Sequence, residues 1–166
     1  MRRYLPFFVL CLIFFCLPLQ IFVIGNNLGI GIQGAVYRFQ VTEYGNYFFP
    51  ITREILFVMN GTLTGKTALS ISLWAAATAL LACTIVFAFI HVNDTTTRYY
   101  RQIVQGLFFS CVIYLGSLII QYGFLFSGPA GISIPLGILL ILVWTAVIWY
   151  YKNTFGTFLN FFNVRF

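Results

Sequence analysis

Long uncharged apolar runs dominate the chain, and short segments between them hold its charged residues. Four runs, residues 4–24, 67–90, 103–125 and 132–151, contain no Asp, Glu, Lys, Arg or His. A transmembrane helix needs about 20 apolar residues to cross a hydrocarbon core about 30 Å thick. Strands of a membrane β-barrel would instead alternate polar and apolar positions over about ten residues. The pattern therefore predicts four membrane-spanning helices.

Composition and charge support this interpretation and predict an orientation. Only 7% of residues are charged, whereas soluble domains carry about 25%. Basic residues near membrane spans are retained in the cytoplasm. The predicted inner side carries Arg2, Arg3, Arg98, Arg101, Lys152 and Arg165, and the outer side carries Arg38, Arg53 and Lys66. We therefore expect a plasma (cell) membrane protein with both termini cytoplasmic, whose net charge of +6 reflects topology and contact with anionic lipid, not nucleic acid.

Residues 25–66 form the only long connection, and we expect them to fold as a small β-rich extracytoplasmic cap. Residues 35–44 alternate between apolar and polar positions, which is typical of a half-buried strand. Gly45-Asn46 predicts a turn, and residues 47–49 and 55–58 predict a second strand or a short helix. Pro50 excludes a central strand through residues 49–51, because proline cannot donate to a neighbouring strand.

The predicted fold class is an all-α transmembrane bundle of four helices, with the β-rich cap between helices 1 and 2 and a C-terminal interfacial helix. The other connections are a cytoplasmic loop at 91–102, a short outer turn at 126–131 and a tail at 152–166 with apolar residues at helical spacing. Four spans with one large loop between the first two resemble the claudin-type tetraspan topology. The resemblance is one of architecture, and it assigns no residue role, because the paired loop cysteines and the loop Trp of that family's signature are absent.

The cap is rich in aromatic residues, for which two interpretations remain open. Rings can fill a small core or lie at headgroup depth, or they can form a face that binds another protein. The interaction candidates are Tyr37, Phe39, Tyr44, Tyr47, Phe48, Phe49 and Phe57.

Small and polar residues predict which helix faces meet. In the second span Ser72, Ala76 and Ala79 recur at helical spacing, and in the third span Gly106, Ser110 and Ser117 do so. Such stripes let two backbones approach closely within a membrane. Gln20 and Gln121 are expected near the outer boundary, where they can hydrogen-bond across helices.

Candidate chemistry is sparse, and we predict no catalytic, metal or cofactor site. Residues 60–67 end like a phosphate-binding loop, but Asn60 stands where the first glycine belongs. His91 and Asp94 are spaced to pair at a helix end, and the cysteines, all within spans, show no C-x-x-C spacing. Asn60 also begins an N-x-T sequon, a possible glycosylation site in an outward loop.

These observations favour a non-catalytic accessory or scaffold protein that engages other membrane proteins, or copies of itself, through the outer loop. The alternative is a small transporter or channel subunit that acts as an oligomer, and a membrane enzyme with a lipid-like substrate comes third. Acids or bases inside the spans would favour either alternative, and the four runs contain none.

Overall fold

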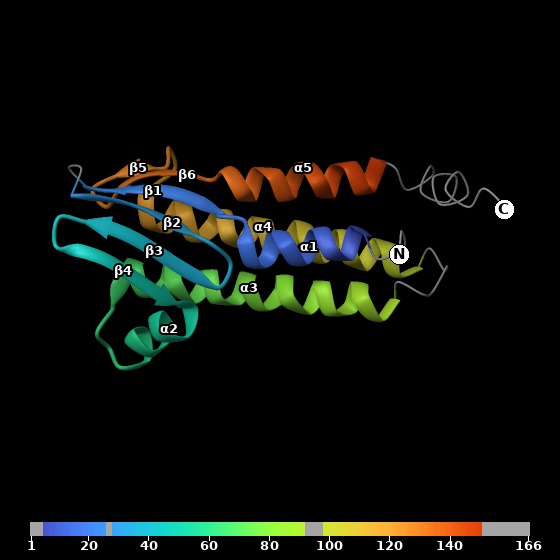
Figure 1. The fold of residues 1–166 in the computed structure, drawn as a ribbon, viewed down its shortest axis with the longest axis horizontal. Helices are drawn as coiled ribbons and strands as arrows, with labels where there is room; N and C mark the ends of the chain where they lie inside the picture. Colours follow the sequence, from blue (N-terminus) through green and yellow to red (C-terminus); the bar gives the residue numbers. More distant parts are fainter. Residues whose placement is uncertain (1–4, 26–27, 92–97, 151–166) are drawn as a thin grey trace.

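The computed structural model describes residues 5–25, 28–91 and 98–150, which form five helices and one antiparallel sheet of six strands (Figure 1). The helices are α1 (Leu5–Cys16), α2 (Ile51–Met59), α3 (Gly65–His91), α4 (Arg98–Tyr122) and α5 (Leu136–Tyr150). The strands are β1 (Gln20–Ile24), β2 (Gly29–Gln33), β3 (Tyr37–Thr42), β4 (Gly45–Pro50), β5 (Ser127–Gly128) and β6 (Gly131–Ile134). Their order across the sheet is β4-β3-β2-β1-β6-β5.

The long helices α3 and α4 lie side by side, with α1 and α5 beside them, and the sheet overlies the end where α3 begins and α4 ends (Figure 1). Trp74 and Ile71 of α3, Leu107 of α4 and Ile141 of α5 are fully buried between these elements. One core therefore joins the helices to the inner face of the sheet.

The predicted all-α bundle of four spanning helices is wrong. The chain combines helices with a six-stranded sheet, and among the described residues two helices, Gly65–Ile90 and Arg101–Tyr122, are long and apolar enough to cross a membrane. The predicted first span divides into α1 and β1, and the predicted fourth span begins with β6 before α5.

Proline marks both divisions. Pro18 follows the end of α1, and Pro135 lies between β6 and α5. Proline lacks the N–H that a continuing helix needs, and it also disfavours helical backbone in the residue before it. Between these prolines and the neighbouring turns, β1 and β6 are rich in isoleucine and valine, which suit a strand. The length of an apolar run alone did not distinguish one long helix from a short helix followed by a strand.

The cap prediction holds in its local detail. The alternating segment forms β3, the segment after the turn forms β4, and residues 55–58 belong to the short helix α2. β4 is an edge strand and ends at Pro50, so the missing proline N–H interrupts no central ladder. Strands of the cap pair with β6 through β1, so the sheet extends beyond residues 25–66.

The small and polar residues of the expected stripes lie on the buried face of α4, whereas on α3 they lie on the exposed face. Ser110 and Ser117 are buried, and a Cβ at Gly106 would overlap Oγ1 of Thr84, so this glycine permits close approach. On α3 the expected stripe of Ser72, Ala76 and Ala79 is exposed in the chain as described. The buried face of α3 instead carries larger side chains, including Ile71, Trp74, Thr78, Leu81 and Ile85.

Candidate functional site

A chain of polar side chains crosses the inner side of the sheet, facing the helices. Ser133 Oγ donates to Gln20 Oε1 at 2.6 Å, and Gln20 Nε2 donates to Gln33 Oε1 at 2.7 Å. The same Gln33 oxygen accepts from Nε and Nη2 of Arg38 at 3.2 and 3.0 Å. Arg38 Nη1 then pairs with Glu54 Oε1 at 3.3 Å. We call these five residues the Arg38 network.

The Arg38 network joins elements that are far apart in the sequence. Ser133 belongs to β6, Gln20 to β1, Gln33 to β2, Arg38 to β3 and Glu54 to α2. The Arg38 and Glu54 side chains are only 12% and 5% exposed. Removing a buried charge from water is costly unless it is paired and hydrogen-bonded, and here each member has a partner. The network therefore fixes α2 against the sheet in one orientation.

Aromatic rings enclose the guanidinium group of Arg38. Its Cζ lies 5.4 Å from the ring centroid of Trp74 and 5.8 Å from that of Phe22. Cations at this distance are attracted to the face of a ring. Trp74 Nε1 donates to the Gly34 carbonyl at 3.2 Å, and Thr78 Oγ1 donates to the Ala35 carbonyl at 2.7 Å. These contacts hold the turn between β2 and β3 against α3.

The sequence pattern did not indicate this site. It predicted Arg38 on the outer side and a hydrogen bond between Gln20 and Gln121. That expected contact is wrong, because Gln121 Oε1 accepts from Ser70 Oγ at 3.1 Å while Gln20 bonds to Gln33 and Ser133. A signal was present, since Gln20 and Gln33 are single polar residues within apolar segments. Only the antiparallel register of β1 and β2, which pairs these two positions, brings them together.

The aromatic candidates separate into two groups. On one face of strands β3 and β4, the rings of Tyr37 and Phe48 stack with their centroids 6.1 Å apart. On the opposite face of β4, the Phe49 ring stacks with Tyr47 at 6.1 Å and meets Phe57 of α2 edge-on at 6.5 Å. Phe39 is partly buried beside Phe48 on the next strand, and Tyr44 is 86% exposed at the β3–β4 turn. The rings therefore form no single surface.

The Tyr37 side chain links the end of the sheet at the β2–β3 turn to the C-terminal end of α1. Burial raises the pKa of its phenol, and the neighbouring Cys16 thiol raises it further. The phenol O–H donates a long hydrogen bond of 3.5 Å to the Cys16 carbonyl.

Helix α2 presents an apolar outer surface. Its Glu54 side is buried, whereas Leu56 and Met59 are exposed on the opposite side. Arg53 extends over Phe49 and Phe57, with its Cζ 5.4 Å from each ring centroid. We call Arg53, Leu56 and Met59 the α2 patch.

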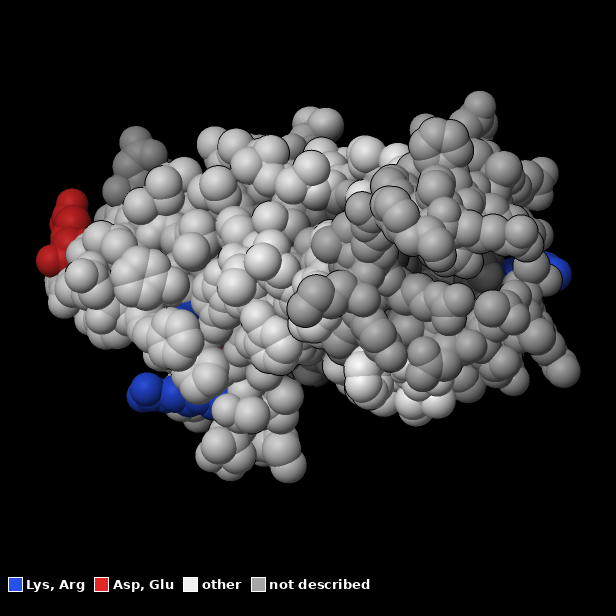
Figure 2. Space-filling view, turned by 45° about the vertical axis from the view of Figure 1, so that its right-hand side comes forward, with Lys and Arg blue, Asp and Glu red and all other residues white. Residues whose placement is uncertain are grey.

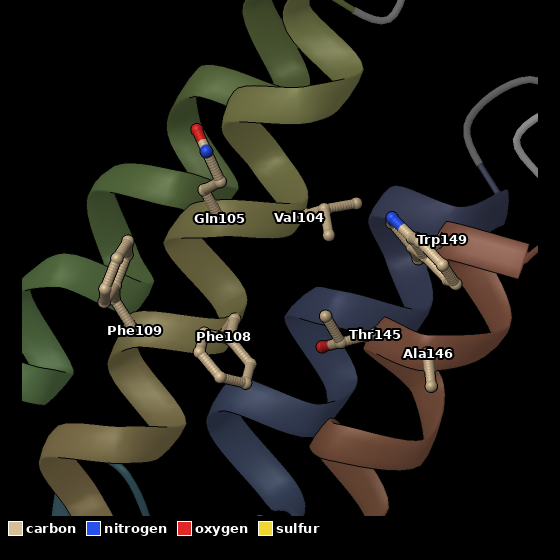
Figure 3. Close-up of a pocket in the computed structure, with 7 residues that line it drawn as sticks. All are labelled: Val104, Gln105, Phe108, Phe109, Thr145, Ala146 and Trp149. Atoms are coloured by element: carbon tan, nitrogen blue, oxygen red, sulfur yellow. The ribbon is translucent and has the colours of Figure 1, made fainter.

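An open groove of about 410 Å³ lies between α4 and α5, where Val104 extends toward Trp149 (Figure 3). Its lining is Val104, Gln105, Phe108 and Phe109 of α4 and Thr145, Ala146 and Trp149 of α5. Thr145 Oγ1 already donates to the Ile141 carbonyl of its own helix at 2.7 Å. Small-molecule sites combine an apolar lining with several convergent polar groups, and this groove offers the Gln105 amide and the Trp149 indole N–H.

The remaining candidates stay separate from these features. Residues 60–64 form an exposed turn after a helix, whereas a phosphate-binding loop follows a strand. Asn60 is exposed at the C-terminal end of α2, and its glycosylation remains a prediction. The His91–Asp94 pairing and the tail at 152–166 lie outside the described residues. Of the cysteines, Cys111 is buried and Cys16 and Cys83 are exposed.

The site thus consists of a buried charged network that positions a small helix with an exposed apolar surface. Comparison of this chain with protein-family models, curated proteins and solved structures finds no match.

Proposed function

We propose that the protein is a non-catalytic integral membrane protein that binds other membrane proteins through the α2 patch, as an accessory or scaffold component. α3 and α4 are proposed to anchor it in the cell membrane, with the sheet and α2 at the extracytoplasmic end of these helices and both termini cytoplasmic. The observation that carries the proposal is the buried Arg38–Glu54 pair, which fixes α2 while leaving its apolar side exposed.

A fixed apolar surface suits binding. Ordering side chains and loops at an interface costs free energy, and a surface that is already held in place avoids part of that cost. Arg and aromatic residues are enriched at protein interfaces, and Arg53 lies over two rings beside the α2 patch. The contacts of Arg38 support a structural role for its charge, because its Nε and Nη2 groups donate to Gln33 and its Nη1 group pairs with Glu54.

The test is purification of the full chain from its native membrane in a mild detergent, followed by identification of the proteins that remain bound. We expect Leu56→Ser to reduce recovery of a specific partner at least fivefold. Leu28→Ser is the matched control, because Leu28 is the same residue type, lies in the β1–β2 turn and is 52% exposed against 54% for Leu56. Equal loss in both variants, or a clean monomer from the unmodified chain, would overturn the proposal.

A further inference from the structure

The sheet has a second face, turned away from the helices, whose side chains are almost all apolar. Along β2 and β6 the inward residues Gly31, Gln33 and Ser133 are buried, while Ile30 and Ile132 between them are exposed. Adding the cross-strand partners extends this face over five strands. The row nearer the helices is Ile134, Ile21, Ile32, Phe39 and Phe48. The farther row is Ile132, Val23, Ile30, Val41 and Asn46. We call these two rows the outer sheet face.

We propose that the outer sheet face contacts the lipid of the bilayer, so that the membrane boundary crosses the strands instead of lying where helices give way to strands. This inference rests on the proposed function in one respect, the placement of α3 across the membrane. The occupant of the face is then the acyl-chain and headgroup region of the outer leaflet.

The depth of the sheet follows from its contacts with α3. Trp74 and Thr78 bind the carbonyls of Gly34 and Ala35, so the β2–β3 turn lies level with these two residues. Thr78 is the midpoint of α3, about 13 residues from each end of that helix. At about 1.5 Å per residue, the turn is only about 20 Å from either end of α3. A hydrocarbon core about 30 Å thick therefore reaches past the turn and along the sheet.

The extent of that overlap depends little on where α3 sits. If the core is centred on α3 it extends about 15 Å beyond Thr78, and if it begins at His91 it extends about 10 Å beyond. At about 3.3 Å per strand residue, this covers about three to five residues of each strand. Ile32 is three residues from Ala35 and Ile30 is five, so the overlap includes the row that contains Phe39 and Phe48 and ends at or before the farther row.

Polarity along the strands agrees with this boundary. The nearer row is apolar throughout, the farther row ends in Asn46, and the exposed Glu43 follows at the β3–β4 turn. The helices that adjoin the sheet also expose apolar side chains, Leu12 and Phe15 of α1 and Leu136 and Leu140 of α5. On the face drawn in Figure 2, the charged residues lie toward the two ends, and the described surface between them is uncharged.

At the end of the sheet close to the helices, the backbone N–H is absent at Pro50 on one edge and hydrogen-bonded at Ser133 on the other, as contact with hydrocarbon requires. Unpaired N–H and C=O groups do not face hydrocarbon, so an exposed strand edge there would be costly. The near end of edge strand β4 is Pro50, which has no N–H. At the other edge β5 covers only the far part of β6, but the Ser133 N–H donates to the Phe126 carbonyl at 2.8 Å.

A second copy of the chain fits the outer sheet face less well. Five strands about 4.8 Å apart, with two rows of side chains, give about 300 Å² of flat area. A stable interface needs about 800 Å² from each partner. Apolar side chains of this extent are expected to be covered in a native protein, and lipid covers them without requiring a complementary surface.

The test places the photocrosslinker p-benzoylphenylalanine in the full chain, reconstituted in phosphatidylcholine nanodiscs, and reads the adducts by mass spectrometry. Phe48 is the test position, since it is 59% exposed and the replacement keeps its ring. Val86, exposed on α3, reports on the membrane span, and Tyr44 reports on the sheet tip. Ile134, exposed in the same row as Phe48, is the second test position if the Phe48 variant does not fold.

We expect a phospholipid adduct at Phe48 at no less than half the yield found at Val86, and at least fivefold less at Tyr44. A lipid adduct at Val86 without one at the test position would overturn the inference and leave the membrane anchor intact. A covalent dimer at the test position would also overturn it and assign the face to a second copy. No lipid adduct at Val86 would refute the membrane placement of α3, and with it both proposals.

Discussion

Removing the carboxylate of Glu54 is expected to destabilise the protein far more than removing an exposed carboxylate. Glu54→Ala leaves the Arg38 guanidinium buried without its charged partner, 3.3 Å from where Oε1 lay. Breaking a buried pair by deleting one partner costs about 3–5 kcal/mol. Since about 1 kcal/mol shifts Tm by about 2–4 °C in a chain of this size, we expect a loss of about 6–20 °C.

The measurement is thermal unfolding of the full chain in one detergent, followed by circular dichroism and by tryptophan fluorescence. Trp74 is a local reporter, because its ring faces Arg38. Glu43→Ala is the matched control, since Glu43 is exposed, and surface substitutions of this kind change stability by about 0.5 kcal/mol or less. If the Glu54 and Glu43 variants unfold at the same temperature, the Arg38 network does not hold α2.

A double replacement separates the charge pair from simple loss of packing. Apolar residues of similar volume often replace a buried ion pair without loss of stability. Arg38→Met combined with Glu54→Leu should therefore lie within about 2 kcal/mol of the unmodified protein, although each single replacement costs more. Strictly additive effects would refute direct coupling between the two side chains.

Two further predictions concern the contact between α3 and α4, both measured by thermal unfolding in the same detergent. Gly106→Ala should destabilise by about 1–3 kcal/mol, because the new Cβ would overlap Thr84 Oγ1. Gly116→Ala is the control, because its Cβ would meet nothing within 4 Å, and it should gain about 0.5–1 kcal/mol from helix propensity. Equal effects of the two substitutions would contradict the close approach at Gly106. Ser117→Ala removes the hydrogen bond from Ser117 Oγ to the Ser70 carbonyl at 2.8 Å and should cost about 0.6–2 kcal/mol. Ser72→Ala is the control on the exposed side of α3 and should cost less than about 0.5 kcal/mol. A larger loss of stability for Ser72→Ala than for Ser117→Ala would mean that α3 packs on α4 through the face that carries Ser72.

Much of the local structure follows from the sequence. The alternation in residues 35–44 predicted β3, and Pro50 excluded a central strand through residues 49–51, which agrees with the position of β4 at the edge of the sheet. The apolar lengths of α3 and α4 were also evident, because a long uncharged run without an interior proline has few structures other than a helix. Gly106, Ser110 and Ser117 were assigned to the packed face of α4 from their spacing alone.

Tertiary structure decided what apolar content leaves open. Both strands and helices bury isoleucine and valine, so β1 and β6 became strands only because β2 pairs with β1 and β1 pairs with β6. The exposed stripe of Ser72, Ala76 and Ala79 shows the same limit, since small residues permit close packing but do not choose the partner. The Arg38 network joins residues up to 113 positions apart. Its members meet because strand register, a long-range property, sets which side chains share a face.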